Sequence, residues 1–384
     1  MLATYSLKLP KVVFGGEDSL EQLAGVLEKE GAQKVAVFTD PTLRKLGLVD
    51  PVLAAVKAAG AEATVYDDIP AEPSYGQVQA VVDQVAGTGE DIVVAVGGGS
   101  VMDTAKLACV CAGADYTVHD LLSDPKRAKK QIACVAVPTT AGTGAEATIN
   151  AIVAVSEDEV KIGIVNDDMM PDYVLLDVRM IQNLPRSIAA ATGLDAMCHA
   201  IECFTCKKAN PFSDMFALEA FDLIINNIER ACDDKDALDA KRAMQVAALY
   251  GGIAITASGT TAVHGLSYPL GGKYHVPHGV SNAILLSPVM HFNEPAIRDR
   301  LAIAYDRAIK GDAKTEEEKS AAVIERMDQI VSHLDIPKTL DALGVHDASI
   351  DWLAEAGIKQ QRLLSNNKRE VTLEDAKAIY RQIM

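Results

Sequence analysis

Short runs of β-branched residues alternate with helical patterns in the first half of the chain. Helical periodicity marks three stretches: Leu20–Glu30, Leu43–Ala59 and Tyr75–Ala86. Around them lie five runs with the length and composition of buried strands: Lys34–Thr39, Ala63–Tyr66, Asp91–Val96, Ile132–Val137 and Val174–Asp177. This alternation predicts a Rossmann-like α/β domain, in which helices cover both faces of a parallel sheet.

The β-branched runs stop near Arg186, and the second half of the chain carries only helical periodicity. Six stretches show it: Ser187–Cys206, Phe212–Ala231, Lys241–Val263, Asn293–Ile309, Glu316–Leu334 and Leu373–Ile383. A chain of 384 residues is also too long for one ordinary core. We therefore predict two domains, an α/β domain at residues 1–185 and an all-helical domain at residues 186–384.

Composition and charge narrow the class of protein. Apolar residues make up 49% of the chain, which is typical of a globular protein. The net charge is −17, so nucleic acids and anionic membranes would repel the protein. Residues Met1–Lys8 contain no apolar core of signal-peptide length, and seven cysteines without framework spacing fit a reducing compartment. The long apolar stretch Ala243–Val263 is interrupted by Tyr250–Gly252 and is predicted to be a buried helix. We expect a cytoplasmic protein with neither a nucleic-acid nor a membrane partner.

A glycine-rich turn follows the predicted strand that ends at Val96. Its residues Gly98 and Gly99 would let backbone N–H groups approach a pyrophosphate at the start of a helix. Ser100 and Asp103 have the spacing of a helix start. The turn lacks the G-x-G-x-x-G fingerprint, so a plain glycine-rich turn before a capped helix is the alternative.

Two further strand ends carry polar residues suited to a dinucleotide. The strand ending at Val137 is followed by a loop rich in glycine and hydroxyl groups, with Thr139, Thr140 and Thr143. Asp40 follows the first strand, where its carboxylate would accept hydrogen bonds from a ribose and disfavour a 2′-phosphate, favouring NAD over NADP. Asp40 also suits a simple helix cap.

Four metal-type residues lie between positions 195 and 278. Asp195 and His199 are four residues apart, which places them on one face of a helix, and His264 and His278 follow. One carboxylate and three imidazoles suit Fe(II) or Zn and leave room for a substrate oxygen. The alternative for Asp195 and His199 is an ordinary surface pair.

The sequence motifs around these residues are similar to those of a known family. Six segments carry the resemblance, in this order along the chain: Gly97–Lys106, Pro138–Glu146, Ala191–Glu202, His264–Gly265, Pro269–Gly272 and Pro277–Gly279. The chain resembles the iron-containing (group III) alcohol dehydrogenases. The resemblance implies a dehydroquinate synthase-like two-domain architecture, NAD as cofactor, Fe(II) or else Zn as the metal, and a homodimer or higher homo-oligomer.

The resemblance also suggests roles for single residues. Lys161, after a charged turn at Glu157–Glu159, would lie near the nicotinamide, and Leu184 would be another cofactor contact. Many members carry a histidine where this chain has Tyr268, so the path of the proton differs or Tyr268 relays it. His275 is an alternative relay, an anchor for a charged substrate tail, or a plain surface histidine.

A metal and a dinucleotide in one cleft between two domains indicate hydride transfer between NAD(H) and a small alcohol or aldehyde. The run Ile255–Ala262 is smaller and more hydroxylated than in typical members, which favours a short polar substrate such as a hydroxy acid, diol or semialdehyde. The alternatives are a zinc polyol dehydrogenase of the glycerol type, a relative of dehydroquinate synthase, a metal-dependent hydrolase with Glu202 as general base, and a non-catalytic metal-binding protein.

Overall fold

The computed structural model describes residues 4–155 and 160–384, and the charged turn at Glu157–Glu159 lies outside the described residues. The chain divides into two compact units. We call them the α/β unit, with Lys8–Thr140 and Gly144–Asn183, and the helical unit. The helical unit contains Leu184–Met384, the N-terminal residues up to Leu7 and the short loop Ala141–Thr143.

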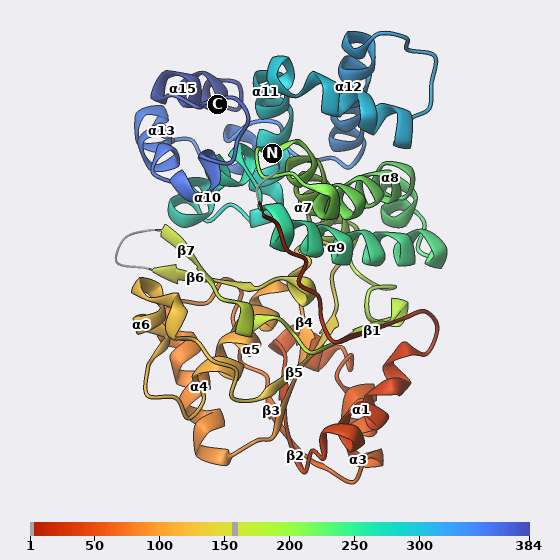
Figure 1. Cartoon of the computed structure of the whole chain (residues 1–384), viewed down its shortest axis with the longest axis vertical. Helices are drawn as coiled ribbons and strands as arrows, with labels where there is room; N and C mark the ends of the chain where they lie inside the picture. Colours follow the sequence, from red (N-terminus) through yellow and green to blue (C-terminus); the bar gives the residue numbers. More distant parts are fainter. Residues whose placement is uncertain (1–3, 156–159) are drawn as a thin grey trace. The chain divides into compact units, whose positions relative to one another are not determined.

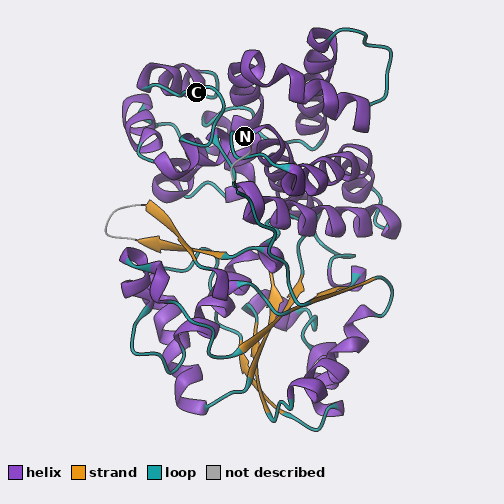
Figure 2. Ribbon diagram, in the orientation of Figure 1, coloured by secondary structure: helices purple, strands orange, loops and turns teal. Residues whose placement is uncertain are grey.

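The α/β unit is built on a six-stranded parallel sheet, as the sequence predicts (Figures 1 and 2). Its strands in spatial order are β1 (Val12–Gly15), β8 (Tyr173–Leu176), β5 (Ala133–Pro138), β4 (Ile92–Gly97), β2 (Lys34–Phe38) and β3 (Glu62–Tyr66). Every residue of β4 is buried, as expected of a central strand with helices on both faces. The sequence patterns missed the edge strand β1 and the strand β6 (Asn150–Val155). Strand β6 pairs with β7 (Val160–Val165) in an antiparallel hairpin.

Helices cover both faces of the sheet (Figure 1). Their bounds are α1 (Gln22–Glu30), α2 (Pro41–Lys45), α3 (Asp50–Ala58), α4 (Tyr75–Thr88), α5 (Gly99–Cys111) and α6 (Val118–Ser123). Leu27 of α1 and Val52 of α3 belong to one apolar cluster with strand residues such as Val37. The single helix expected at Leu43–Ala59 is wrong, because Gly47 takes a left-handed φ of 73° and separates α2 from α3.

The helical unit contains no strand among its described residues, which confirms the all-helical prediction (Figure 2). Its long helices are α7 (Arg186–Thr205), α8 (Pro211–Asp233), α9 (Leu238–Ser258), α10 (Ala262–Tyr274), α11 (His278–Ala308) and α12 (Glu316–His333). Three shorter ones follow: α13 (Ile350–Ile358), α14 (Gln361–Leu364) and α15 (Leu373–Arg381). Helix α7 is the innermost, since every residue from Gly193 to Thr205 is buried.

Two helix boundaries in this unit differ from the prediction. The helix expected at Lys241–Val263 ends at Ser258, because Gly259 takes a φ of 83° and starts the loop to α10. The helix expected from Asn293 begins at His278, and it accommodates Pro288 and Pro295 in its interior. No single described helix is long and apolar enough to cross a bilayer, and α9 and α10 meet that criterion only as a pair bent by 106°.

Candidate metal centre

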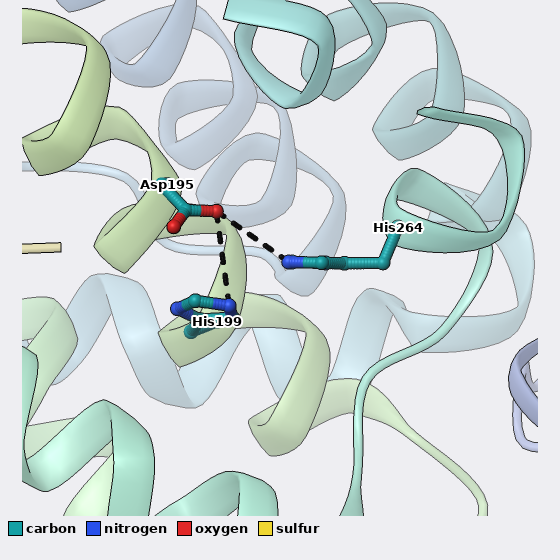
Figure 3. Close-up of side chains that lie close together, drawn as sticks. All are labelled: Asp195, His199 and His264. Carbon is teal, nitrogen blue, oxygen red and sulfur yellow. Dashed lines mark ion pairs between the residues drawn. The ribbon is translucent and has the colours of Figure 1, made fainter. Parts of the chain in front are cut away.

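Asp195 and His199 lie one turn apart on α7 and point toward His264 (Figure 3). Asp195 is 2% exposed and His199 5% exposed. His199 Nε2 lies 3.7 Å from Asp195 Oδ1. The alternative of an ordinary surface pair is therefore wrong, because a buried carboxylate needs a cationic or hydrogen-bonding partner.

His264 in the first turn of α10 and His278 at the start of α11 complete a ring around the same oxygen. His264 Nε2 lies 3.5 Å from Asp195 Oδ1, and His278 Nε2 lies 3.6 Å from it. Donor atoms bound tetrahedrally at roughly 2.0–2.2 Å from an ion are about 3.4 Å apart. The four residues thus have the donor types that suit a divalent metal. Asp195, His199 and His264 offer ligand atoms all within 4.8 Å of one another, and His278 approaches this group at Asp195 Oδ1.

Glycines allow the helices that carry these ligands to approach closely. A Cβ on Gly279 would lie 2.2 Å from the backbone oxygen of Ala191, so the start of α11 packs directly against α7. At the next residue of α7, Thr192, a second glycine makes a similar approach. A Cβ on Gly142 would lie 2.6 Å from Thr192 Cβ. The glycine after His278 is therefore a packing requirement that brings His278 to Asp195.

Glu202 orients His264 from behind. It is fully buried, and its Oε2 contacts His264 Nδ1. Its Oε1 accepts hydrogen bonds from Thr261 Oγ1 at 2.6 Å and from the Val263 N–H at 2.7 Å. A carboxylate on Nδ1 fixes the tautomer that leaves Nε2 free to ligate. Because both oxygens of Glu202 are engaged in this way, it is not available as the general base that a hydrolase would need.

Asn282 is a residue of this site that the sequence analysis missed. It is fully buried one turn after His278 on α11, and its Nδ2 donates to Asp195 Oδ1 at 2.7 Å. The same nitrogen lies 3.1 Å from His264 Nε2 and 3.2 Å from His278 Nε2. Its Oδ1 has no hydrogen-bond partner in the described part of the chain. The four-residue spacing from His278 was the available signal.

Electrostatics favour a cation here. Burial raises the pKa of Asp195, but the surrounding imidazoles outweigh burial and hold that pKa well below its usual range. Burial lowers the pKa of His264, but Glu202 and Asp195 outweigh burial and raise it to about 9. Burial lowers the pKa of His199. Two buried carboxylates beside these rings thus attract positive charge, which a proton or a metal ion supplies.

Tyr268 and His275 have different surroundings. The ring of Tyr268, one turn after His264 on α10, lies 6.1 Å from the His278 ring, and burial raises the pKa of its hydroxyl. His275 is exposed and ends α10 in a left-handed conformation with a φ of 54°. Among the described residues, no side-chain contact joins His275 to the four candidate ligands. Of the two predicted relays, only Tyr268 lies beside them.

The predicted cofactor loops meet at one edge of the sheet in the α/β unit. Strand β2 is followed by β3 on one side, whereas β4 pairs with the other side of β2. The strand order therefore reverses between β2 and β4, which is where ligands bind in open α/β sheets. Asp40 follows β2 and Gly98 follows β4 at this point, and a Cβ on Gly98 would lie 3.4 Å from Thr140 Cγ2 after β5.

Several of the predicted cofactor residues have partners within the protein. Asp40 caps α2, because its Oδ1 accepts from the N–H groups of Thr42 at 2.8 Å and Leu43 at 2.9 Å. The helix start predicted at Ser100 is wrong, because the glycine backbone lets α5 begin at Gly99 with Gly98 as its N-cap.

The remaining predicted contacts are distributed over both units. In the α/β unit, Asp103 accepts from the Ile152 N–H at 2.9 Å and pairs with Lys106 at 3.1 Å. Ser100 Oγ accepts from the Glu72 N–H at 3.0 Å, and Lys161 pairs with the Glu72 carboxylate at 2.5 Å. The Thr139 N–H donates to Gly97 O at 3.0 Å. Thr143 and Leu184 belong to the helical unit.

Comparison with known proteins shows the family of this chain. Residues 10–178 match the model of the iron-containing alcohol dehydrogenases, and residues 189–384 match that of the C-terminal part of the Fe-containing alcohol dehydrogenase family. Long-chain-alcohol dehydrogenase 1 of Geobacillus thermodenitrificans is 33% identical over 97% of this chain and 94% of its own. Lactaldehyde reductase of Escherichia coli is 32% identical over 97% of both chains. The crystal structure of a 1,3-propanediol oxidoreductase superposes with a TM-score of 0.94 over 100% of both chains at 29% identity. The chain belongs to the iron-containing alcohol dehydrogenase family.

Proposed function

We propose that this protein is a metal-dependent dehydrogenase that transfers a hydride between NAD(H) and a short polar alcohol or its aldehyde. The observation that carries the proposal is the ring of three imidazole nitrogens, 3.5–3.7 Å from a single Asp195 oxygen. In the oxidation direction, alcohol and NAD⁺ give carbonyl compound, NADH and one proton. The hydride leaves the carbon that carries the hydroxyl, and the proton leaves the hydroxyl oxygen.

Asp195, His199, His264 and His278 would hold the metal. When bound, a divalent metal acts as a Lewis acid, which lowers the pKa of a substrate hydroxyl and polarises a carbonyl. The protein's own part is to fix the donors: Glu202 holds the ring of His264, and Asn282 hydrogen-bonds to Asp195. We propose Fe(II) as the metal, with Zn as the alternative, since imidazole and carboxylate donors suit both.

NAD would bind at the reversal of strand order in the α/β unit. The N-terminus of α5 at Gly98 and Gly99 would offer a pyrophosphate backbone N–H groups that have no partner within the helix. Asp40 would accept from the ribose through the oxygen that is not used in capping α2. Tyr268 would hold the proton, because it is buried within a ring contact of His278.

Two hydroxyl groups of the run Ile255–Ala262, which suggested a short polar substrate, have hydrogen-bond partners inside the protein. Ser258 Oγ donates to Ala254 O at 3.1 Å, and Thr261 Oγ1 donates to Glu202 at 2.6 Å. Two of the hydroxyls in the run Ile255–Ala262 therefore serve the protein interior and not a pocket. The preference for a polar substrate depends instead on the side chains around Tyr268.

The metal-dependent hydrolase loses support as an alternative function. A metal-dependent hydrolase would need a free carboxylate base, and Glu202 is bound to His264 and the loop before α10. A zinc polyol dehydrogenase shares the reaction and differs in metal and substrate. A cytoplasmic location and a homodimer or higher homo-oligomer remain predictions from composition and from the family.

The test is elemental analysis of protein purified without chelator, together with NADH absorbance on mixing with short alcohols, aldehydes and keto acids. We expect one metal ion per chain and substrate-dependent NADH turnover. Metal without turnover of any alcohol or aldehyde would contradict the proposed dehydrogenase, and no binding of Fe(II) or Zn would contradict the ligand set.

A further inference from the structure

Arg362 lies beside the candidate metal centre, in the helical unit. It lies in the short helix α14, and its guanidinium interacts with the Tyr268 hydroxyl. The ring of Tyr268 is in turn 6.1 Å from the ring of His278. A guanidinium is therefore two side chains away from Asp195, next to the residue that we propose holds the proton.

Packing fixes the segment that carries Arg362. At Gly265, directly after His264, a Cβ would lie 3.0 Å from Leu364 Cδ2 and 3.6 Å from Leu363 Cβ, so α14 rests directly on α10. Asn366 is 2% exposed and donates to the carbonyl oxygens of Ser258 at 2.9 Å and Gly259 at 3.2 Å. The backbone around Arg362 is thus tied to the loop that leads into the candidate ligand His264.

The charge of Arg362 has no ionic partner among the described residues, although acidic residues outnumber basic ones by 53 to 36. By contrast, Arg326 forms an ion pair with Glu229 at 2.6 Å, and Arg300 pairs with Asp214. The Arg362 side chain is also exposed, so a small molecule can reach it. A planar fork of donors that is exposed and free of carboxylates suits a carboxylate, sulfonate or phosphonate.

We propose that Arg362 and the Tyr268 hydroxyl form an anion subsite, and that the substrate is a short aldehyde or alcohol with a negatively charged tail. This inference rests on the proposed function, because the tail would bind at Arg362 while the reacting carbon faces the metal ligands. Bidentate pairing with arginine gives geometric specificity in addition to charge. Arg362 is thus the residue that selects acidic over neutral substrates of similar length.

The experiment compares length-matched charged and neutral aldehydes with the metal-loaded full-length protein. The pairs are glyoxylate with glycolaldehyde and succinate semialdehyde with butanal, and the readout is kcat and KM from NADH oxidation. In Arg362→Met, the ratio of kcat/KM for the charged over the neutral partner should fall about 100-fold, or about 2.7 kcal/mol at 1.36 kcal/mol per tenfold. The loss should appear mainly in KM, and Arg362→Lys should restore part of it.

Arg381→Met is the matched control, since it removes one exposed arginine of the same unit in α15 without touching Tyr268. It should leave the ratio unchanged. A second readout needs no turnover: calorimetric titration with propionate, with propionamide as the neutral probe. Propionate binding should disappear in Arg362→Met and persist in Arg381→Met.

The outcomes separate this inference from the proposed function. One outcome is propionate binding that depends on Arg362, together with no NADH oxidation when any of the aldehydes is added. This result would support the anion subsite and contradict the dehydrogenase. Turnover with a charged-to-neutral ratio that Arg362→Met leaves unchanged would overturn the anion subsite and leave the dehydrogenase intact. A preference of the unmodified protein for the neutral partner of both pairs would also overturn the subsite.

Discussion

The two units build their candidate sites in different ways. In the helical unit, ionisable side chains surround one another: three imidazoles face Asp195, and Glu202 supports His264. In the α/β unit, the candidate cofactor site is largely backbone, with the N-terminus of α5 next to the loop after β5. A site made of paired side chains should fail when one member is removed, whereas a site made of backbone should tolerate the loss of a single side chain.

One buried carboxylate of the α/β unit differs from the two at the candidate metal centre. Asp195 and Glu202 in the helical unit have imidazole and hydrogen-bonding partners. Glu146 in the α/β unit is 1% exposed, and its Oε1 has no hydrogen-bond partner among the described residues. A paired buried charge contributes to a site, whereas an unpaired one lowers stability when it ionises.

The largest expected effect is the loss of the metal in Asp195→Ala. Removing the carboxylate that faces all three imidazoles should reduce bound metal to less than about a tenth of an equivalent and kcat/KM by on the order of 10³-fold, given what electrostatic and metal contributions supply. Elemental analysis and NADH kinetics measure both. Asp312→Ala, at an exposed aspartate of the same unit, is the control. Full metal content in Asp195→Ala would contradict the expectation that a site of paired side chains fails when one member is removed.

The next effect is a pH-dependent stability change at Glu146. Burial raises its pKa to about 7, so the folded state holds a proton that the unfolded state loses near pH 4.5. Stability contributed by this group is complete below pH 4.5 and is lost as the pH rises through 7. Glu146→Gln should therefore be more stable than the unmodified protein at pH 8, by on the order of 3 kcal/mol, and the gain should shrink toward pH 5. Urea unfolding at both pH values tests this, and an equal gain at both would contradict it.

Glu202→Gln should weaken metal binding without removing it. The amide retains the shape but loses the charge on His264 Nδ1, and partners behind a ligand typically change metal affinity by about 10–100-fold. Competition with a chromogenic chelator measures the affinity. Binding of NADH, followed by its fluorescence, should not change, because Glu202 belongs to the helical unit. Unaltered metal affinity would show that the contact is only structural.

The smallest effect is expected for Asp40→Gly in the α/β unit. Glycine at a helix N-cap costs only a few tenths of a kcal/mol, so α2 should persist. If Asp40 also faces the ribose, the ratio of kcat/KM with NADP to that with NAD should rise several-fold, because a carboxylate repels a 2′-phosphate. Kinetics with both cofactors give this ratio. An unchanged ratio would leave Asp40 as a helix cap alone.

Part of the candidate site could be predicted from residue types and spacing. The four-residue interval between Asp195 and His199 predicts one helix face, and the structure has both on the inner helix α7. Asn282 has the same interval from His278, a signal that the sequence analysis did not use because it considered only ionisable residues as ligands. Arg362 is 98 residues beyond His264, and only the packing of α14 at Gly265 brings it near Tyr268.

The sequence alone determined three features: the alternation of strands and helices, the change to helices near Arg186, and the donor types of the candidate site. These features depend on local period and side-chain chemistry, which neighbouring residues specify. The tertiary structure decided that Glu202 supports His264, that Asp103 pairs with Lys106, and that Arg362 faces no carboxylate among the described residues. Such pairings depend on how closely distant helices approach, and that approach is set by contacts such as Gly279 against Ala191, which no local pattern encodes.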